Sequence, residues 1–133
     1  MTMPTTDELL TAISAHLAAF ELPPIASVLV TAAISAPQVT VQLASHDPAA
    51  IAHGLLAWAD TLTQVTAQAR RVPRSGSVHL SVTGLLTDGA SVLVYGAIPV
   101  PEHGLGTDLA PDTCRTIPLG ALRRATTRRE VRD

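Results

Sequence analysis

Hydrophobic side chains recur at helical spacing near the start of the chain. Four of them fall on one face of a helix over residues 6–20: Leu10, Ile13, Leu17 and Phe20. Thr5 and Glu8 stand in the capping-box arrangement, in which a hydroxyl and a carboxylate accept hydrogen bonds from N–H groups that lack a partner in the first turn. The Pro23-Pro24 pair then ends the pattern. We expect an amphipathic helix whose apolar face packs on the core.

A second helical pattern begins at Asp47-Pro48. The aspartate is a good N-cap acceptor, and proline is tolerated in the first turn because its missing N–H has no helical partner there. Apolar residues follow at spacings of four and three: Ile51, Leu55, Trp58, Leu62 and Val65. The spacing predicts a helix to about Ala69, where Arg70 and Arg71 complement the negative end of the helix dipole.

Four other segments have β character. Residues 26–34 are rich in β-branched side chains, and residues 38–44 alternate between apolar and polar positions. Residues 77–86 and 90–98 flank Thr87-Asp88-Gly89, and a central Asp-Gly pair favours a hairpin. The predicted fold is therefore α+β, of order α-β-β-α-β-β-(α). A four-stranded, mainly antiparallel sheet carries two amphipathic helices on one face.

The second hairpin is expected to pair Thr87 with Ala90 and Val82 with Tyr95. In that register one face carries the core set: Val78, Leu80, Val82, Leu93, Tyr95 and Ala97. The opposite face carries an uncharged mixture: His79, Ser81, Thr83, Leu85, Val92, Val94 and Ile98. Residues 26–34 and 38–44 are expected to form the first antiparallel hairpin. Its outer positions include Thr40 and Gln42, which are also uncharged.

Solvated sheet faces and free sheet edges normally carry charged residues that prevent association. Their absence here predicts that a second copy of the chain covers the outer face or an edge. The residues predicted to form this dimer or partner surface are Thr40, Gln42, His79, Ser81, Thr83 and Val94. The alternative is that the hydroxyl side chains simply solvate the face.

Composition supports a folded domain with a partly covered surface. The 133 residues are 47% hydrophobic, which is enough apolar material to fold, and only 15% are charged, against about a quarter in typical proteins. Residues 1–98 are expected to form the compact domain. Residues 99–118 are rich in proline and glycine and are expected to form a loop, and residues 119–133 a short arginine-rich helix or tail.

Charge is unevenly distributed along the chain. The formal net charge is −2, yet residues 1–69 contain no basic residue, whereas arginines are dense after residue 114. The residues expected to contact phosphate groups are Arg123, Arg124, Arg128 and Arg129. Such contacts would make the protein a nucleic-acid-associated accessory factor, and the alternative is a solvated basic end.

Catalytic, metal and cofactor sites are not expected. The five histidines show no metal-ligand spacing, and the lone Cys114 excludes an internal disulfide and fits the reducing cytoplasm. Cys114 and His103 share the loop 99–118, where an enzyme site is an alternative that lacks a recognisable third group. The acidic N-terminal segment does not resemble a signal peptide, and prolines interrupt the longest uncharged run, so no membrane span is expected.

Four segments carry a resemblance to other proteins: LLTAISAHLAAFELPPIASVLV, VTVQLASHD, LLAWADTLT and SVHLSVTG. Over residues 8–98 the chain resembles a family of small, uncharacterised actinobacterial proteins that are often encoded beside mobile elements. That family has no assigned activity, so the resemblance implies an intracellular accessory role and no site residues. The element order also resembles class I type III secretion chaperones, which are dimeric and bind partner chains but carry an extra strand before the second helix.

These observations together predict a small, cytoplasmic, non-enzymatic and dimeric module that binds a partner protein. The nucleic-acid-associated factor and the enzyme with a site in loop 99–118 are the two alternatives.

Overall fold

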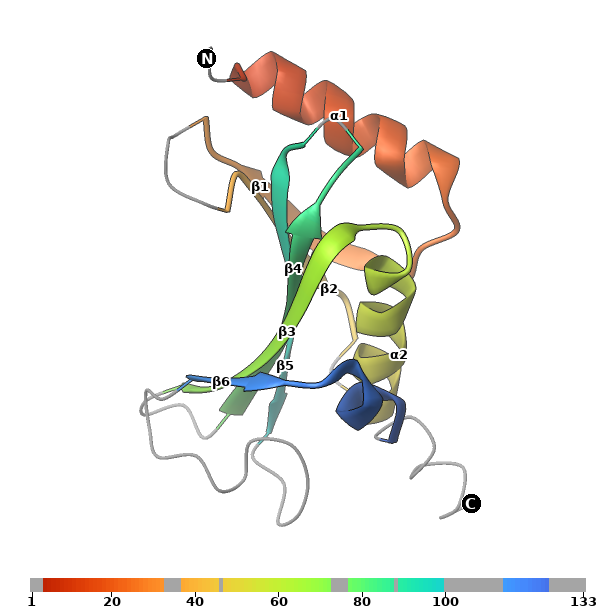
Figure 1. The fold of residues 1–133 in the computed structure, drawn as a ribbon, viewed down its shortest axis with the longest axis vertical. Helices are drawn as coiled ribbons and strands as arrows, with labels where there is room; N and C mark the ends of the chain where they lie inside the picture. The colour runs from red at the N-terminus through yellow and green to blue at the C-terminus, as the bar shows by residue number, and fades with distance from the viewer. Residues whose placement is uncertain are drawn as a thin grey trace.

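One mixed sheet of six strands organises the described part of the chain (Figure 1). The computed structural model describes residues 4–32, 37–45, 47–72, 77–87, 89–99 and 114–124. Its elements are α1 (Thr6–Ala19), β1 (Ile25–Val30), β2 (Val39–Leu43), α2 (Pro48–Ala59), β3 (Thr63–Val72), β4 (Ser77–Leu85), β5 (Ser91–Pro99) and β6 (Cys114–Ile117). A short helix follows at residues 119–124. The α+β class is confirmed, but the predicted four-stranded sheet is wrong because β3 and β6 add two strands.

The strands lie in the order β1-β2-β5-β4-β3-β6. β3, β4 and β5 form an antiparallel meander, and β6 pairs antiparallel with β3. β1 and β2 form the expected antiparallel hairpin, which joins the meander through a parallel pairing of β2 with β5. A parallel pair needs a crossover connection, and α2 forms the helical part of it.

The core lies between α2 and one face of the sheet. In Figure 1, α2 and the short helix lie on one side of the sheet, and α1 crosses its upper end. The α2 side chains of Ile51, Leu55 and Trp58 are fully buried. The sheet contributes a layer of small and β-branched side chains: Val39, Val41, Ala67, Ala69, Val78, Leu80, Val82, Val92 and Val94. Burial of each larger aliphatic side chain contributes about 1.5–3 kcal/mol.

α1 begins as its capping box predicts but presents a different face to the core. The Glu8 N–H donates to Thr5 Oγ1 over 3.1 Å, and the Thr5 N–H donates to Glu8 Oε1 over 3.2 Å. The buried positions are Leu9, Ile13 and His16. Leu10 and Phe20, which the sequence pattern assigns to the core, are exposed. The helix is rotated because the His16 ring stacks on Trp58 of α2, with ring centroids 5.4 Å apart.

α2 is ten residues shorter than its apolar spacing predicts and ends at Ala59, not at Ala69. The Thr61 hydroxyl donates to the Trp58 carbonyl over 2.8 Å, and the Thr61 N–H donates to the same oxygen over 2.9 Å. Such side-chain bonds to a helix end compete with continuation of the helix. The following residues pair with β4 on one side and β6 on the other. This pairing in the sheet outweighs the helical spacing of Leu62 and Val65.

The register of the β4–β5 hairpin differs by one residue from the prediction. Leu86 pairs across the turn with Ala90, because the Leu86 N–H donates to the Ala90 carbonyl over 2.9 Å. Three residues therefore form the turn, and the last is Gly89 at φ +92°, a conformation that glycine adopts readily. Val82 consequently lies opposite Val94, not opposite Tyr95. A one-residue slip exchanges the two faces of a strand.

The C-terminal part of the predicted loop 99–118 contains β6, which forms one edge of the sheet. The short helix then places Leu122 in the core, fully buried. Across the described segments, no helix has the length and apolar character needed to cross a lipid bilayer.

Candidate binding surface

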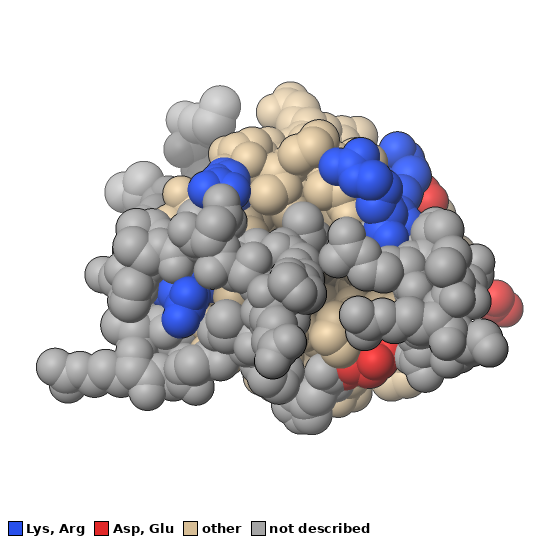
Figure 2. Space-filling model, turned by 90° about the horizontal axis from the view of Figure 1, so that it is seen from below, with Lys and Arg blue, Asp and Glu red and all other residues tan. Residues whose placement is uncertain are grey.

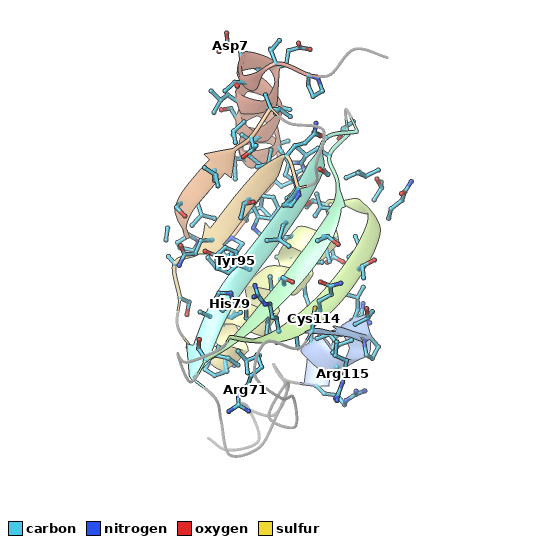
Figure 3. The ribbon with its side chains drawn as sticks, turned by 90° about the vertical axis from the view of Figure 1, so that its left-hand side faces the viewer. Asp7, Arg71, His79, Tyr95, Cys114 and Arg115 are labelled. Atoms are coloured by element: carbon cyan, nitrogen blue, oxygen red, sulfur yellow. The ribbon has the colours of Figure 1, made fainter. Side chains whose placement is uncertain are left out.

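The face of the sheet away from the helices carries very little charge. Figure 3 views this face, with β2, β5, β4 and β3 side by side and the helices behind them. We call it the open face, and strand alternation and pairing define its residues as Thr40, Gln42, Thr66, Gln68, Arg70, Ser77, His79, Ser81, Thr83, Leu85, Leu93, Tyr95, Ala97, Cys114 and Thr116. Arg70 is the one charged residue in this set.

The polar groups of the open face bond partly to one another. The Ser27 hydroxyl of β1 donates to Gln42 Oε1 over 3.3 Å, and the Thr83 hydroxyl donates to the Thr66 carbonyl over 3.4 Å. The Cys114 thiol donates to Gln68 Oε1 over 3.5 Å. These contacts leave the central residues half-buried. The surface is therefore ordered and only weakly polar.

An aromatic pair lies at the centre of the open face. The rings of His79 and Tyr95 stack with centroids 5.2 Å apart and planes 24° from parallel (Figure 3). Arg70 lies opposite His79 in the neighbouring strand. Partial burial and the Arg70 charge both lower the pKa of His79, which keeps the ring neutral at pH 7. The pair is thus an uncharged, largely rigid anchor for an incoming side chain.

Five of the six residues predicted for a dimer or partner surface lie on the open face: Thr40, Gln42, His79, Ser81 and Thr83. Val94 does not, because the three-residue turn directs it into the core, where it is fully buried. The same shift brings Leu93 and Tyr95, which were assigned to the core, onto the open face. Gln68 and Arg70 were missed because their segment was assigned to the second helix.

Four of the five arginines that the structure describes lie toward one end of the molecule. Arg71 and Arg115 lie at the end of the sheet opposite Asp7 of α1 (Figure 3). Arg123 and Arg124 are exposed on the short helix that follows β6. Figure 2, which views this end, shows arginine side chains on both sides of the surface. Arg128 and Arg129, the other two predicted phosphate contacts, lie outside the described residues.

No three His, Cys, Asp or Glu side chains converge as metal ligands within the described segments. His16 and His79 are instead engaged in ring contacts, and Cys114 lies on the open face beside Gln68. His103, the other member of the alternative enzyme site, lies outside the described residues.

His16 connects α1 to the end of α2. Its Nε2 lies 2.8 Å from Thr61 Oγ1, whose own proton is donated to the Trp58 carbonyl, so the histidine donates from Nε2. The ring also lines a groove of about 630 Å³ between α1 and the β4–β5 turn. Burial lowers the pKa of His16 below its ordinary value of 6.5.

We expect the fold to lose stability as the pH falls below about 6.5, because the unfolded chain then binds protons that His16 and His79 resist in the folded state. Thermal unfolding midpoints between about pH 7.5 and about pH 5.5 would measure this loss. A His16→Gln variant keeps a donor for Thr61 and does not titrate, so its midpoint should fall less over the same range. An equal fall in the variant and the natural protein would contradict the assignment to His16.

Comparison of the chain with protein-family models, with curated proteins and with solved structures gives no match. The resemblances to the actinobacterial family and to the secretion chaperones stay predictions. The functional conclusion therefore depends on the chemistry of the open face and of the two sheet edges.

Proposed function

We propose that this protein is a small, non-enzymatic and dimeric binding module that holds a partner protein on the open face of its sheet. The observation that carries the proposal is the near absence of charge from this face, where Arg70 is the single ionic side chain. A face exposed to water alone normally carries charges that keep it soluble and separate. The hydroxyl, amide and aromatic groups here suit contact with another protein surface.

The size of the open face also supports a protein partner. β3 has ten residues, and β4 and β5 have nine each. At roughly 4.8 Å between strands and roughly 3.3 Å per residue, the five strands of the open face present an area of about 590 Å². A standard protein interface buries about 800 Å² on each partner. The face therefore supplies about three quarters of one standard binding surface.

Its composition follows the usual anatomy of an interface. Interface centres are depleted of charge and enriched in tyrosine and arginine, which often contribute most of the binding energy. Tyr95 lies near the middle of the open face, stacked on His79, and Arg70 lies one strand further along. We infer that Tyr95 inserts between side chains of the partner and that Arg70 pairs with a carboxylate or a carbonyl there.

A photo-crosslinking amino acid at Thr83 is expected to capture the partner in cells that express the natural protein. His53, which is exposed on α2, is the matched control position. The captured protein, once purified, should bind the natural module and should lose at least about tenfold in affinity to a Thr83→Arg variant, since an unpaired buried charge disrupts an interface. His53→Arg should bind normally. Capture from both positions alike, or full affinity of Thr83→Arg, would contradict the proposal.

The clustered arginines favour nucleic acid as the second candidate partner. Phosphate binding by this end would give an affinity that falls steeply with salt. An Arg123→Ala/Arg124→Ala variant would then lose that salt dependence, whereas Thr83→Arg would not. If this result is obtained and photo-crosslinking from Thr83 captures no protein, nucleic-acid binding would replace protein binding as the proposed function.

A further inference from the structure

The exposed large hydrophobic side chains of the described chain belong to two elements. They are Leu10 at 46% exposure, Phe20 at 43%, Val28 at 37% and Leu29 at 63%. Leu10 and Phe20 belong to α1 and its C-cap, and Val28 and Leu29 belong to β1. α1 also contacts β1. Leu29 lies opposite Thr40 and so continues the open face, whereas Val28 lies opposite the buried Val41 on the other face.

β1 is an edge strand whose pairing with β2 is irregular between Ile25 and Ser27 and regular from Ser27 to Val30. Within the described residues it pairs with β2 alone. Its sequence, IASVLV, contains no charge and no proline, and four of its six residues are exposed. β6, the opposite edge, is only four residues long and carries the exposed Arg115. Short length and charge are two common ways of protecting an edge, and β1 has neither protection.

The hydrogen bonds of β1 determine which backbone groups are directed outward. The Thr31 N–H donates to the Gln38 carbonyl over 2.8 Å, so residue 31 bonds toward β2. Antiparallel pairing alternates this direction from one residue to the next. Leu29 therefore bonds toward β2 as well, and the N–H and C=O groups of Val28 and Val30 point away from the sheet.

We propose that β1 pairs with β1 of a second copy of the chain, in antiparallel orientation and about a two-fold axis at Val28. The two six-stranded sheets then form one continuous sheet. The inference rests on the proposed dimeric function and identifies the surface that forms the dimer. A two-fold contact brings the same strand of each copy together in opposite directions. With the axis at Val28, its outward N–H and C=O groups bond to those of Val28 in the second copy.

The same arrangement covers the exposed side chains of Val28 and Leu29 on β1. Ser27 of one copy lies opposite Leu29 of the other, and no charged residue opposes another along the shared edge. Continuation of the sheet also leaves the open faces of both copies on the same side, where they form one double-width surface for the partner protein.

A charge exchange at the two-fold axis tests the inference. Val28→Lys and Val28→Glu each place like charges opposite each other, which destabilises a strand pair. We expect the natural protein to sediment as a dimer at tens of micromolar, each variant as a monomer, and an equal mixture of the two variants as a dimer. Thr116→Lys and Thr116→Glu on β6 are matched controls at the opposite edge, and both should remain dimeric.

Circular dichroism melting of each variant would establish that it is folded. If a Val28 variant does not fold, the pair Leu29→Lys and Leu29→Glu replaces it, because Leu29 is the most exposed of the four hydrophobic residues and lies next to the axis. A monomeric natural protein, dimeric single variants, or a mixture that stays monomeric would each overturn the inference. Photo-crosslinking from Thr83 in the Val28→Lys background separates the two proposals, because partner capture there supports the open face whether or not the edge forms a dimer.

Discussion

Replacement of Trp58 by alanine is expected to lower the free energy of unfolding by about 3–5 kcal/mol, which is the usual range for deletion of a large core aromatic side chain. Trp58 is fully buried on α2 and is the largest side chain in the core. It also stacks on His16, so its loss removes a contact that holds α1 as well as α2. The effect should therefore be large for a domain of this size, since total stabilities are about 5–15 kcal/mol.

Urea unfolding followed by far-ultraviolet circular dichroism would measure this change. Trp58→Phe is the matched control, because it keeps an aromatic ring and removes the indole N–H, for which the described residues supply no hydrogen-bond partner. An unpaired buried donor is unfavourable, so its removal offsets part of the lost packing. Trp58→Phe should lower the free energy of unfolding much less than Trp58→Ala does. A loss below about 1 kcal/mol for the alanine variant would contradict the central position of Trp58 in the core.

Local signals in the sequence predicted where the helices begin. The capping box at Thr5 and the Asp47 N-cap are both formed, because each depends on residues within one turn. The end of α2 was mispredicted for the opposite reason. Apolar residues continue at helical spacing past Ala59, and the choice of strand depends on pairing with β4 and β6, which lie far along the chain. A single sequence does not contain that information in its local pattern.

The residues of the open face were partly predicted from the sequence. The wrong assignment of the β5 residues has one physical source. The uncharged positions of β2 and β4 were recognised because period-two alternation alone assigns them to one face. The β5 positions were inverted because Asp-Gly was taken as the centre of a two-residue turn, whereas Gly89 closes a three-residue turn. Leu86 and Ala90 are apolar, flank the turn and are both buried. This apolar pair is the sequence signal that favours the three-residue turn over the two-residue turn.

Gly96 is the position where an added methyl group should have the second large effect. A Cβ there would lie 2.7 Å from Ile51 Cγ2 and 2.9 Å from Ile51 Cγ1. Ile51 is fully buried and β-branched, so its side chain has little freedom to move away. Gly96→Ala is therefore expected to lower the free energy of unfolding by about 1–3 kcal/mol, as overpacked cores do. Urea unfolding would measure the loss.

The same contact links the core to the open face, because Gly96 lies between Tyr95 and Ala97 in β5. Ile51→Ala alone should cost about 2–5 kcal/mol through its cavity. In the double variant the new methyl group occupies part of that cavity. The double variant should therefore lose at least about 1 kcal/mol less stability than the sum of the losses in the two single variants. Gly120→Ala is the control, since its Cβ would meet only Arg124 Nη1 at 3.6 Å. Simple additivity would mean that the loss caused by Gly96→Ala does not come from the contact with Ile51.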